Sequence, residues 1–209
     1  TVKMCGIAGI VSLNSKEVFV EKLKTMTDSL SHRGPDGEGH WVSDDGLTGF
    51  GHRRLAIIDL SEAGRQPMEY LDRYTITYNG EIYNYVELKE MCERKGYTFS
   101  THTDTEVLMA MYDWKKEECL TFFDGMFAFA LHDAREKKIF IARDRFGEKP
   151  FFYSHLPGQS FYFASEMKSF WSAGIPKKAN QRMLYNYLAF NYLDNPAAAT
   201  ETFFENIYN

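Results

Sequence analysis

The chain has 209 residues, enough for one domain or two small ones, and its 44% hydrophobic and 25% charged residues are ordinary for a globular protein, which excludes wholesale disorder. The net charge of −5 argues against a nucleic-acid partner, which usually meets a basic surface. No apolar run approaches the ~18 residues of a membrane span, and the first residues lack a secretory signal. We therefore expect a cytoplasmic protein with no nucleic-acid or membrane partner.

Apolar spacing and turn residues divide the chain into short strands and helices. Strands are predicted at 5–13, in a hairpin about Asp45-Gly46 within 39–60, and at 74–78, 126–132, 138–143, 151–154 and 161–164. Helices are predicted at 16–30, 84–95, from about 104, and at 166–171 and 182–191. The last four strands suggest one antiparallel meander. Because strands and helices come in blocks and do not alternate strictly, the order favours an α+β fold.

Three of these elements carry specific signals. Phe19, Leu23, Met26 and Leu30 are spaced as one apolar stripe of the first helix. Thr103-x-x-Glu106 is a capping box, which predicts a helix start at Asp104. Gly6 and Gly9 in the first strand indicate close approach by another backbone or a ligand.

The cysteines and histidines limit the chemistry. Cys5, Cys92 and Cys119 are an odd, widely spaced set, which favours a reducing compartment over a disulfide scaffold. We expect Cys92 and Cys119 to be core residues. The 6 histidines lack the paired spacing of a zinc site, so no metal is predicted. Phosphate-loop, dinucleotide-binding and Gly-x-Ser-x-Gly motifs are absent from the sequence.

Cys5 directly follows Met4, so removal of an initiator methionine would expose it as the first residue. An N-terminal cysteine combines a nucleophile with an α-amine of pKa ~8, which can accept a proton near neutral pH. The alternative is a buried structural cysteine, since free cysteine is among the most buried residue types. Position alone does not decide between the two.

Several motifs together resemble the class II (N-terminal-nucleophile) glutamine amidotransferases, most closely the glutaminase part of the B-type glutamine-hydrolysing asparagine synthetases. They lie at 4–9, 32–36, 52–59, 79–84, 103–106, 142–147 and 164–168. The resemblance implies a four-layer α-β-β-α sandwich of two antiparallel sheets, the N-terminal nucleophile hydrolase fold. It also implies one amidotransferase domain over 4–209, with residues 1–3 a remnant added ahead of the native start.

The resemblance also implies roles for individual residues. Cys5 would be the nucleophile, and Asn79 with Gly80 would form the oxyanion hole. Arg54 would hold the α-carboxylate of glutamine. The backbone of the following residues would line the ligand: Leu55, Ala56, Ile57 and Ile58. Glu81 and Asp104 would lie near the α-ammonium.

Some of these motifs have structural alternatives. Asn79-Gly80 is also the strongest short signal for a type I′ turn, and Asp104 in the first turn of a helix is favoured by the helix dipole. Residues 32–36 can be a rigid turn. Arg143 and Asp144 are expected to form a structural ion pair, and Arg53 has no assignable role.

The function implied is hydrolysis of glutamine to glutamate and ammonia through a cysteinyl thioester. Ammonia would pass to an ATP-dependent asparagine synthetase domain, whose Ser-Gly-Gly-x-Asp-Ser loop this sequence lacks. ATP and Mg²⁺ are expected only in that domain, so this chain needs no cofactor. It is predicted to be a truncated piece, and a homodimer is a further expectation. The alternatives are an amidotransferase domain serving a sugar, phosphoribosyl or modified acceptor, or a non-catalytic module that retains the fold.

Overall fold

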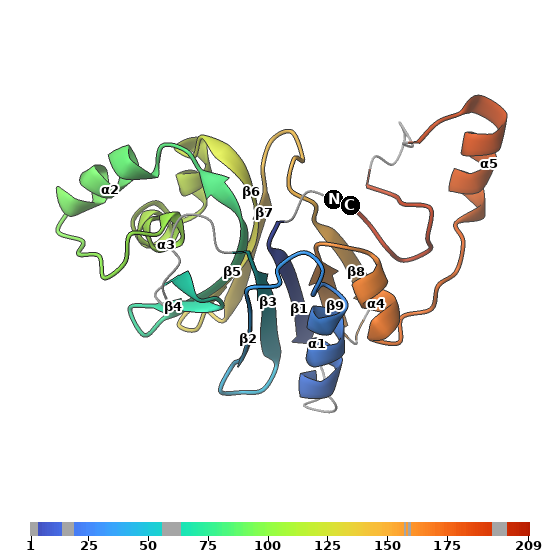
Figure 1. Cartoon of the computed structure of the whole chain (residues 1–209), viewed down its shortest axis with the longest axis horizontal. Helices are drawn as coiled ribbons and strands as arrows, with labels where there is room; N and C mark the ends of the chain where they lie inside the picture. The colour runs from blue at the N-terminus through green and yellow to red at the C-terminus, as the bar shows by residue number, and fades with distance from the viewer. Residues whose placement is uncertain (1–3, 14–18, 56–63, 157, 159, 194–199) are drawn as a thin grey trace.

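The computed structural model describes residues 4–13, 19–55, 64–156, 158, 160–193 and 200–209. Two antiparallel sheets face each other, and helices cover the outer face of each (Figure 1). The predicted α-β-β-α sandwich is therefore confirmed. Ala56, Ile57 and Ile58 lie outside the described residues, as do residues 1–3.

The first sheet has the order β2-β3-β1-β9-β8. Its strands are β1 (Gly6–Ser12), β2 (Gly37–Val42), β3 (Thr48–Arg54), β8 (Phe152–Leu156) and β9 (Ser160–Ala164). The hairpin between β2 and β3 is confirmed, and Gly46 has the positive φ of 69° that such a turn requires. β1 is central and almost fully buried, which explains its small and apolar residues.

The second sheet has the order β4-β5-β6-β7. Its strands are β4 (Met68–Tyr70), β5 (Tyr74–Ile82), β6 (Gly125–Asp133) and β7 (Lys138–Arg143). The expectation of a single meander from residue 126 onward is wrong, because β8 and β9 belong to the first sheet. The free edge of β1 takes the hydrogen bonds of β9, with Ala8 opposite Ala164. Residues 144–151 therefore cross from one sheet to the other.

The helices are placed by their apolar faces. α1 (Phe19–Asp28) and α4 (Lys168–Ser172) cover the first sheet, whereas α2 (Tyr85–Glu93), α3 (Asp104–Lys115) and the 3₁₀ helix η2 (Lys116–Thr121) cover the second (Figure 1). The stripe of Leu23, Met26 and Leu30 is fully buried as predicted, and the side chain of Phe19 lies outside the described residues. α5 (Gln181–Phe190) stands away from the sheets (Figure 1). Among the described helices, none is long and apolar enough to cross a membrane.

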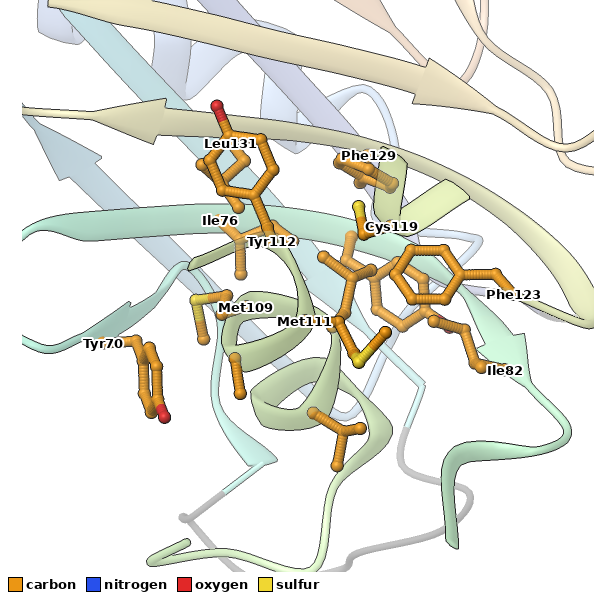
Figure 2. Packing of buried hydrophobic residues seen from close by; sticks show 14 of the residues in the cluster. Tyr70, Ile76, Ile82, Met109, Met111, Tyr112, Cys119, Phe123, Phe129 and Leu131 are labelled. Atoms are coloured by element: carbon orange, nitrogen blue, oxygen red, sulfur yellow. The ribbon is translucent and has the colours of Figure 1, made fainter. Parts of the chain in front are cut away.

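The largest core cluster lies between α3 and the second sheet (Figure 2). It includes Ile76, Met109, Tyr112 and Phe129, and it confirms Cys119 as a core residue, as it does Cys92. Each such side chain contributes ~1.5–3 kcal/mol when buried. This cluster fixes α3 on the sheet and so places the helix start at Asp104.

Between the sheets the core is aromatic, and its packing explains why position 9 is a glycine. A Cβ on Gly9 would lie 2.1 Å from the ring of Phe163. The neighbour that Gly9 admits is therefore a side chain, not the backbone or ligand that the sequence suggested. Phe163 packs edge-on against Phe50 and stacks on Phe151, which ties β9 to the middle of the sandwich.

Candidate active site

Cys5 lies at the start of β1, beside the end of β3. Its Sγ accepts a hydrogen bond from Leu55 N at 3.3 Å and donates one to Leu55 O at 3.5 Å. Burial raises the pKa of the thiol, and the backbone contact with Leu55 and the charges of Lys149, Arg54 and Arg33 oppose that effect only in part. The thiol is therefore protonated at neutral pH and needs a base to become a nucleophile.

Asn79 lies in β5, on the face that looks across to the first sheet. Successive side chains of a strand alternate, so Asn79 shares a face with Thr77. The hydroxyl of Thr77 donates to Gly51 O of β3 at 3.2 Å, and the ring Nε2 of His52 lies 3.1 Å from Tyr78 O. β5 therefore runs alongside β3 toward Leu55 and Cys5, and the Asn79 side chain lies on the interior face close to that end.

The amide of Asn79 is a buried, uncommitted donor. The residue is 2% exposed, and its Nδ2 has no hydrogen-bond partner among the described residues. A buried unpaired N–H costs ~1–3 kcal/mol, which a ligand oxygen would recover. Sequence position alone could not reveal that this donor is buried.

Asn79 and Gly80 are not a hairpin turn. β5 is continuous from Tyr74 to Ile82 and pairs with β6, with Gly80 opposite Phe127, so the type I′ alternative is wrong. A Cβ at position 80 would lie 2.6 Å from Met126 O and 2.8 Å from Phe127 Cα. Close packing of β6, and not a turn, requires glycine there.

Asp104 is held at the start of α3, facing the second sheet. Its Oδ2 accepts hydrogen bonds from Tyr78 OH at 2.7 Å and Ile82 N at 3.0 Å. Burial raises the pKa of Asp104, and these two contacts offset the rise only in part. The helix start is as predicted, since Thr103 Oγ1 accepts from Glu106 N at 3.3 Å.

Arg54 ends β3 and opens onto a pocket of about 210 Å³. The other residues that line this pocket are Asp36, Gly37, Glu38, Arg65 and Gln66. The charge of Arg54 reaches the Cys5 thiol, whose pKa it lowers. Glu81 lies half-buried at the end of β5, two residues after Asn79. The structure thus brings the predicted residues it describes to one end of the two sheets.

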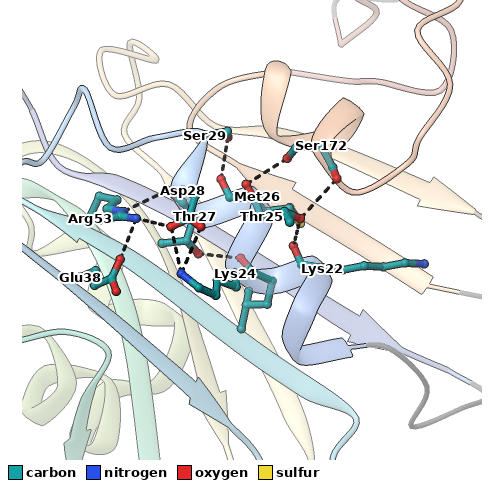
Figure 3. Close-up of polar contacts among 11 residues, drawn as sticks. Lys22, Lys24, Thr25, Met26, Thr27, Asp28, Ser29, Glu38, Arg53 and Ser172 are labelled. Carbon is teal, nitrogen blue, oxygen red and sulfur yellow. Dashed lines mark hydrogen bonds and ion pairs between the residues drawn. The ribbon is translucent and has the colours of Figure 1, made fainter.

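Arg53 acquires a structural role that its sequence did not suggest. Its Nε donates to Thr27 O at 3.2 Å, and its guanidinium pairs with Asp28 and with Glu38, the latter at 2.7 Å (Figure 3). A cation at the C-terminal end of α1 also suits the helix dipole. Arg53 therefore ties α1 to the β2–β3 hairpin and points away from Arg54.

Arg33, within the 32–36 motif, contacts the backbone of Cys5, which sequence reasoning missed. Arg33 Nε donates to Cys5 O at 3.0 Å, and its Nη1 pairs with Glu166 at 3.0 Å. Burial alone would raise the pKa of Glu166, but hydrogen bonds from Arg33, Lys168 and His32 lower it. The segment is also a tight turn, because a Cβ on Gly34 would lie 2.4 Å from the backbone of Arg53. Arg33 and Glu166 both lie in segments that resemble the family, at 32–36 and 164–168. The presence of both segments was the only sequence signal for this contact.

Arg143 and Asp144 do not form the expected ion pair among the described residues. Asp144 instead accepts from four backbone nitrogens, those of Phe127, Phe146, Glu148 and Lys149. Arg143 donates to Lys149 O at 2.7 Å and Gly147 O at 2.6 Å. Both side chains are structural, as predicted, but they brace the turn between the sheets. Within the described residues, no cluster of acidic, cysteine or histidine side chains could hold a metal.

A cysteine at the start of the central strand of one of two facing antiparallel sheets is the arrangement of the N-terminal nucleophile hydrolases. The solved structure of glutamine phosphoribosylpyrophosphate amidotransferase from Bacillus subtilis, complexed with ADP and GMP, has this fold. It matches with a TM-score of 0.66 over 81% of this chain and 44% of that chain, at 22% identity, which supports the fold alone.

The family follows from sequence. The model of the glutamine amidotransferase domain matches residues 4–209, and the chain belongs to that family. It is 43% identical over 198 residues to the glutamine-hydrolysing asparagine synthetase 1 of Bacillus subtilis, covering 93% of this chain and 31% of that protein. It is 46% identical over 171 residues to asparagine synthetase 3 of the same organism, covering 79% and 27%. The chain thus spans less than a third of the length of either relative.

Proposed function

We propose that this chain, with Cys5 as its N-terminal residue, hydrolyses glutamine to glutamate and ammonia. The Cys5 sulfur attacks the side-chain amide carbon, and the thiol proton passes to the α-amine. The tetrahedral intermediate collapses to a thioester as the amine returns the proton to the departing ammonia. Water, deprotonated by the same amine, then attacks the thioester, and glutamate leaves with the thiol restored.

The remaining residues bind and orient the substrate. The Asn79 Nδ2 and the Gly80 N–H stabilise the oxyanion, Arg54 pairs with the α-carboxylate, and Asp104 with Glu81 attracts the α-ammonium. The observation that carries the proposal is the buried Nδ2 of Asn79, which has no hydrogen-bond partner among the described residues and lies on the interior face near the Cys5 end of the sandwich.

We further propose that the ammonia serves an ATP-dependent asparagine synthetase domain, as the names of the relatives suggest. ATP and Mg²⁺ belong to that domain in this proposal, and the present chain works without a cofactor. Residues 4–209 act as one amidotransferase domain.

The deciding experiment compares the chain as printed with a chain that begins at Cys5, each with its N-terminal mass confirmed. An amide nitrogen is no base near neutral pH, and loss of a positioned base typically costs ~10²–10⁴-fold in rate. We expect glutamate release only from the trimmed chain, and labelling of its Cys5 by a diazo-ketone analogue of glutamine. A trimmed Cys5→Ala chain is the blank. Equal rates for the extended and trimmed chains would remove the α-amine from the mechanism.

A further inference from the structure

Lys149 is a buried lysine next to the nucleophile. It is 5% exposed, and its Nζ lies 3.3 Å from the sulfur of Met4, the residue bonded to Cys5. Among the described residues, no carboxylate forms an ion pair with this ammonium. A buried cation without a counter-ion is costly and seldom accidental.

The backbone of Lys149 is fixed from both sides. Its N–H donates to Asp144 Oδ2 at 3.0 Å, and its carbonyl accepts from Arg143 Nε at 2.7 Å. Gly147, with φ of 66°, turns the chain between these contacts. The bracing by Arg143 and Asp144 therefore fixes the backbone from which the Lys149 side chain reaches Met4.

Lys149 is also the cation whose charge affects the Cys5 thiol most, ahead of Arg54 and Arg33. Arg33 is paired with Glu166, and Arg54 is only half-buried on its pocket. Burial lowers the pKa of Lys149 and raises the pKa of the Cys5 thiol, and the charge of each residue opposes the effect of burial on the other. The other charged groups that face Lys149 are Arg33, Glu81 and Glu148, of which Glu148 is exposed. Tyr78, also coupled to Cys5, has a pKa raised by burial and stays neutral.

We propose that Lys149 is a positioning residue for Cys5: its ammonium stabilises the Cys5 thiolate and keeps the adjacent α-amine unprotonated. When the chain begins at Cys5, Met4 is gone and the ammonium faces the nucleophile without the thioether. A fixed positive charge favours the thiolate over the thiol and the amine over its ammonium form. The role in hydrolysis rests on the proposed function, whereas the effect on the thiol does not.

The test uses trimmed chains carrying Lys149→Met, Lys149→Gln and Lys149→Arg, with the exposed Lys95→Met as a matched loss of charge. The pH dependence of Cys5 alkylation by iodoacetamide is followed by peptide mass spectrometry, and the buried Cys92 and Cys119 serve as internal references. The pH profile of glutaminase kcat/KM is measured in parallel. Thermal melting confirms that each variant is folded. Two neutral substitutions, Lys149→Met and Lys149→Gln, are used so that the test still stands if one of them does not fold.

Loss of the charge should move the midpoint of Cys5 alkylation upward by about 1 pH unit and lower kcat/KM at pH 7 by about 10-fold. Lys149→Arg should restore both, and Lys95→Met should change neither. An unchanged alkylation midpoint in folded Lys149→Met or Lys149→Gln would overturn the proposal. If the trimmed parent chain fails to hydrolyse glutamine, the proposed function fails, yet the alkylation midpoint still decides the effect of Lys149 on the thiol.

Discussion

The sulfur of Cys5 lies 3.3 Å from the backbone nitrogen of Leu55, the residue that directly follows Arg54. The end of β3 therefore carries the Arg54 side chain one residue before the backbone group that contacts the Cys5 thiol. Binding of a substrate head group by Arg54 would fix the substrate relative to the nucleophile without a further moving part. Proximity of this kind is a large component of enzymatic rate enhancement.

Replacing Arg54 by alanine should weaken glutamine binding more than it slows the reaction. Charge-assisted hydrogen bonds contribute about 1.5–3 kcal/mol, which corresponds to a rise in KM of roughly 10–150-fold. The adjacent Arg53→Ala is the matched control, because Arg53 faces Thr27 and Asp28 and should alter melting temperature and not KM. A normal KM in Arg54→Ala would exclude this residue from the site.

In contrast to Arg54→Ala, the Asn79→Ala substitution should slow the reaction more than it weakens glutamine binding. Removal of one oxyanion donor typically lowers kcat by ~10²–10³ with little change in KM. Thr77→Val is the control on the same face of β5, since it loses the contact with Gly51 but no donor near Cys5. Pre-steady-state thioester formation would measure the effect directly, and undiminished formation in Asn79→Ala would rule out the assignment.

Tyr78→Phe should make glutamine binding sensitive to acid. The phenol donates to Asp104 and thereby lowers a carboxyl pKa that burial has raised. Without that donor the pKa of Asp104 rises further, so less carboxylate is available as the pH falls. KM should then increase with acidification at a higher pH in the variant than in the parent. Asp104→Asn, which has no carboxylate, should show a high KM without this pH dependence, and a parent-like profile in Tyr78→Phe would contradict the link.

Local signals predicted the elements and the polar groups at their ends. The Thr103 capping box located the start of α3, and the spacing of Leu23 and Met26 located the buried face of α1. What the sequence could not provide was pairing between distant segments. Nothing local to β8 and β9 indicates that β9 pairs with β1 and not with β7, because that choice depends on the unsatisfied edge of β1.

In the candidate site, too, local motifs were readable from the sequence and contacts between distant segments were not. Cys5, Asn79 and Asp104 were predicted as site residues from motifs that resemble a family, whereas the contacts of Arg33 and Lys149 were not predicted. Arg33 reaches the Cys5 carbonyl over 28 residues, and Lys149 reaches Met4 over 145. Such contacts exist only once both sheets are assembled. Residue types at those positions are compatible with surface charges, so burial was the missing information.

The ion pair of Asp133 and Arg73 should contribute to stability at neutral pH and lose that contribution in acid. Asp133 is 1% exposed and accepts two hydrogen bonds from Arg73, at 2.8 and 2.7 Å. Burial alone would raise the pKa of Asp133, but Arg73 and two backbone N–H groups lower it. A lowered pKa means that the stabilisation is complete above the unfolded-state value of ~3.9 and disappears as the pH falls through the folded-state value.

Asp133→Asn should therefore destabilise the fold by about 2–3 kcal/mol at pH 7, as measured by urea unfolding. The difference from the parent should shrink below pH ~4, where the parent carboxyl is protonated on unfolding. Asp72→Asn is the control, because that neighbouring acid is exposed. A difference that does not change with pH would mean that ionisation of Asp133 is not the cause.

α5 and the residues after it should make the chain self-associate. Several large apolar side chains are exposed there: Leu184, Tyr185, Tyr187, Leu188, Phe190, Tyr192 and Leu193. Of the helix itself only Met183 is buried, and α5 stands away from both sheets (Figure 1). Grouped apolar exposure of this kind favours association with a partner, here another copy of the chain.

Sedimentation velocity should show a mass that increases with concentration. Leu188→Lys, at a position 75% exposed, should shift the protein toward monomer without changing its melting temperature. Val20→Lys places the same charge at an exposed apolar position on α1 and should leave association unchanged, because a single apolar side chain on a surface is ordinary. A strictly monomeric parent at every concentration, or an equal effect of the two substitutions, would show that α5 is not the contact surface.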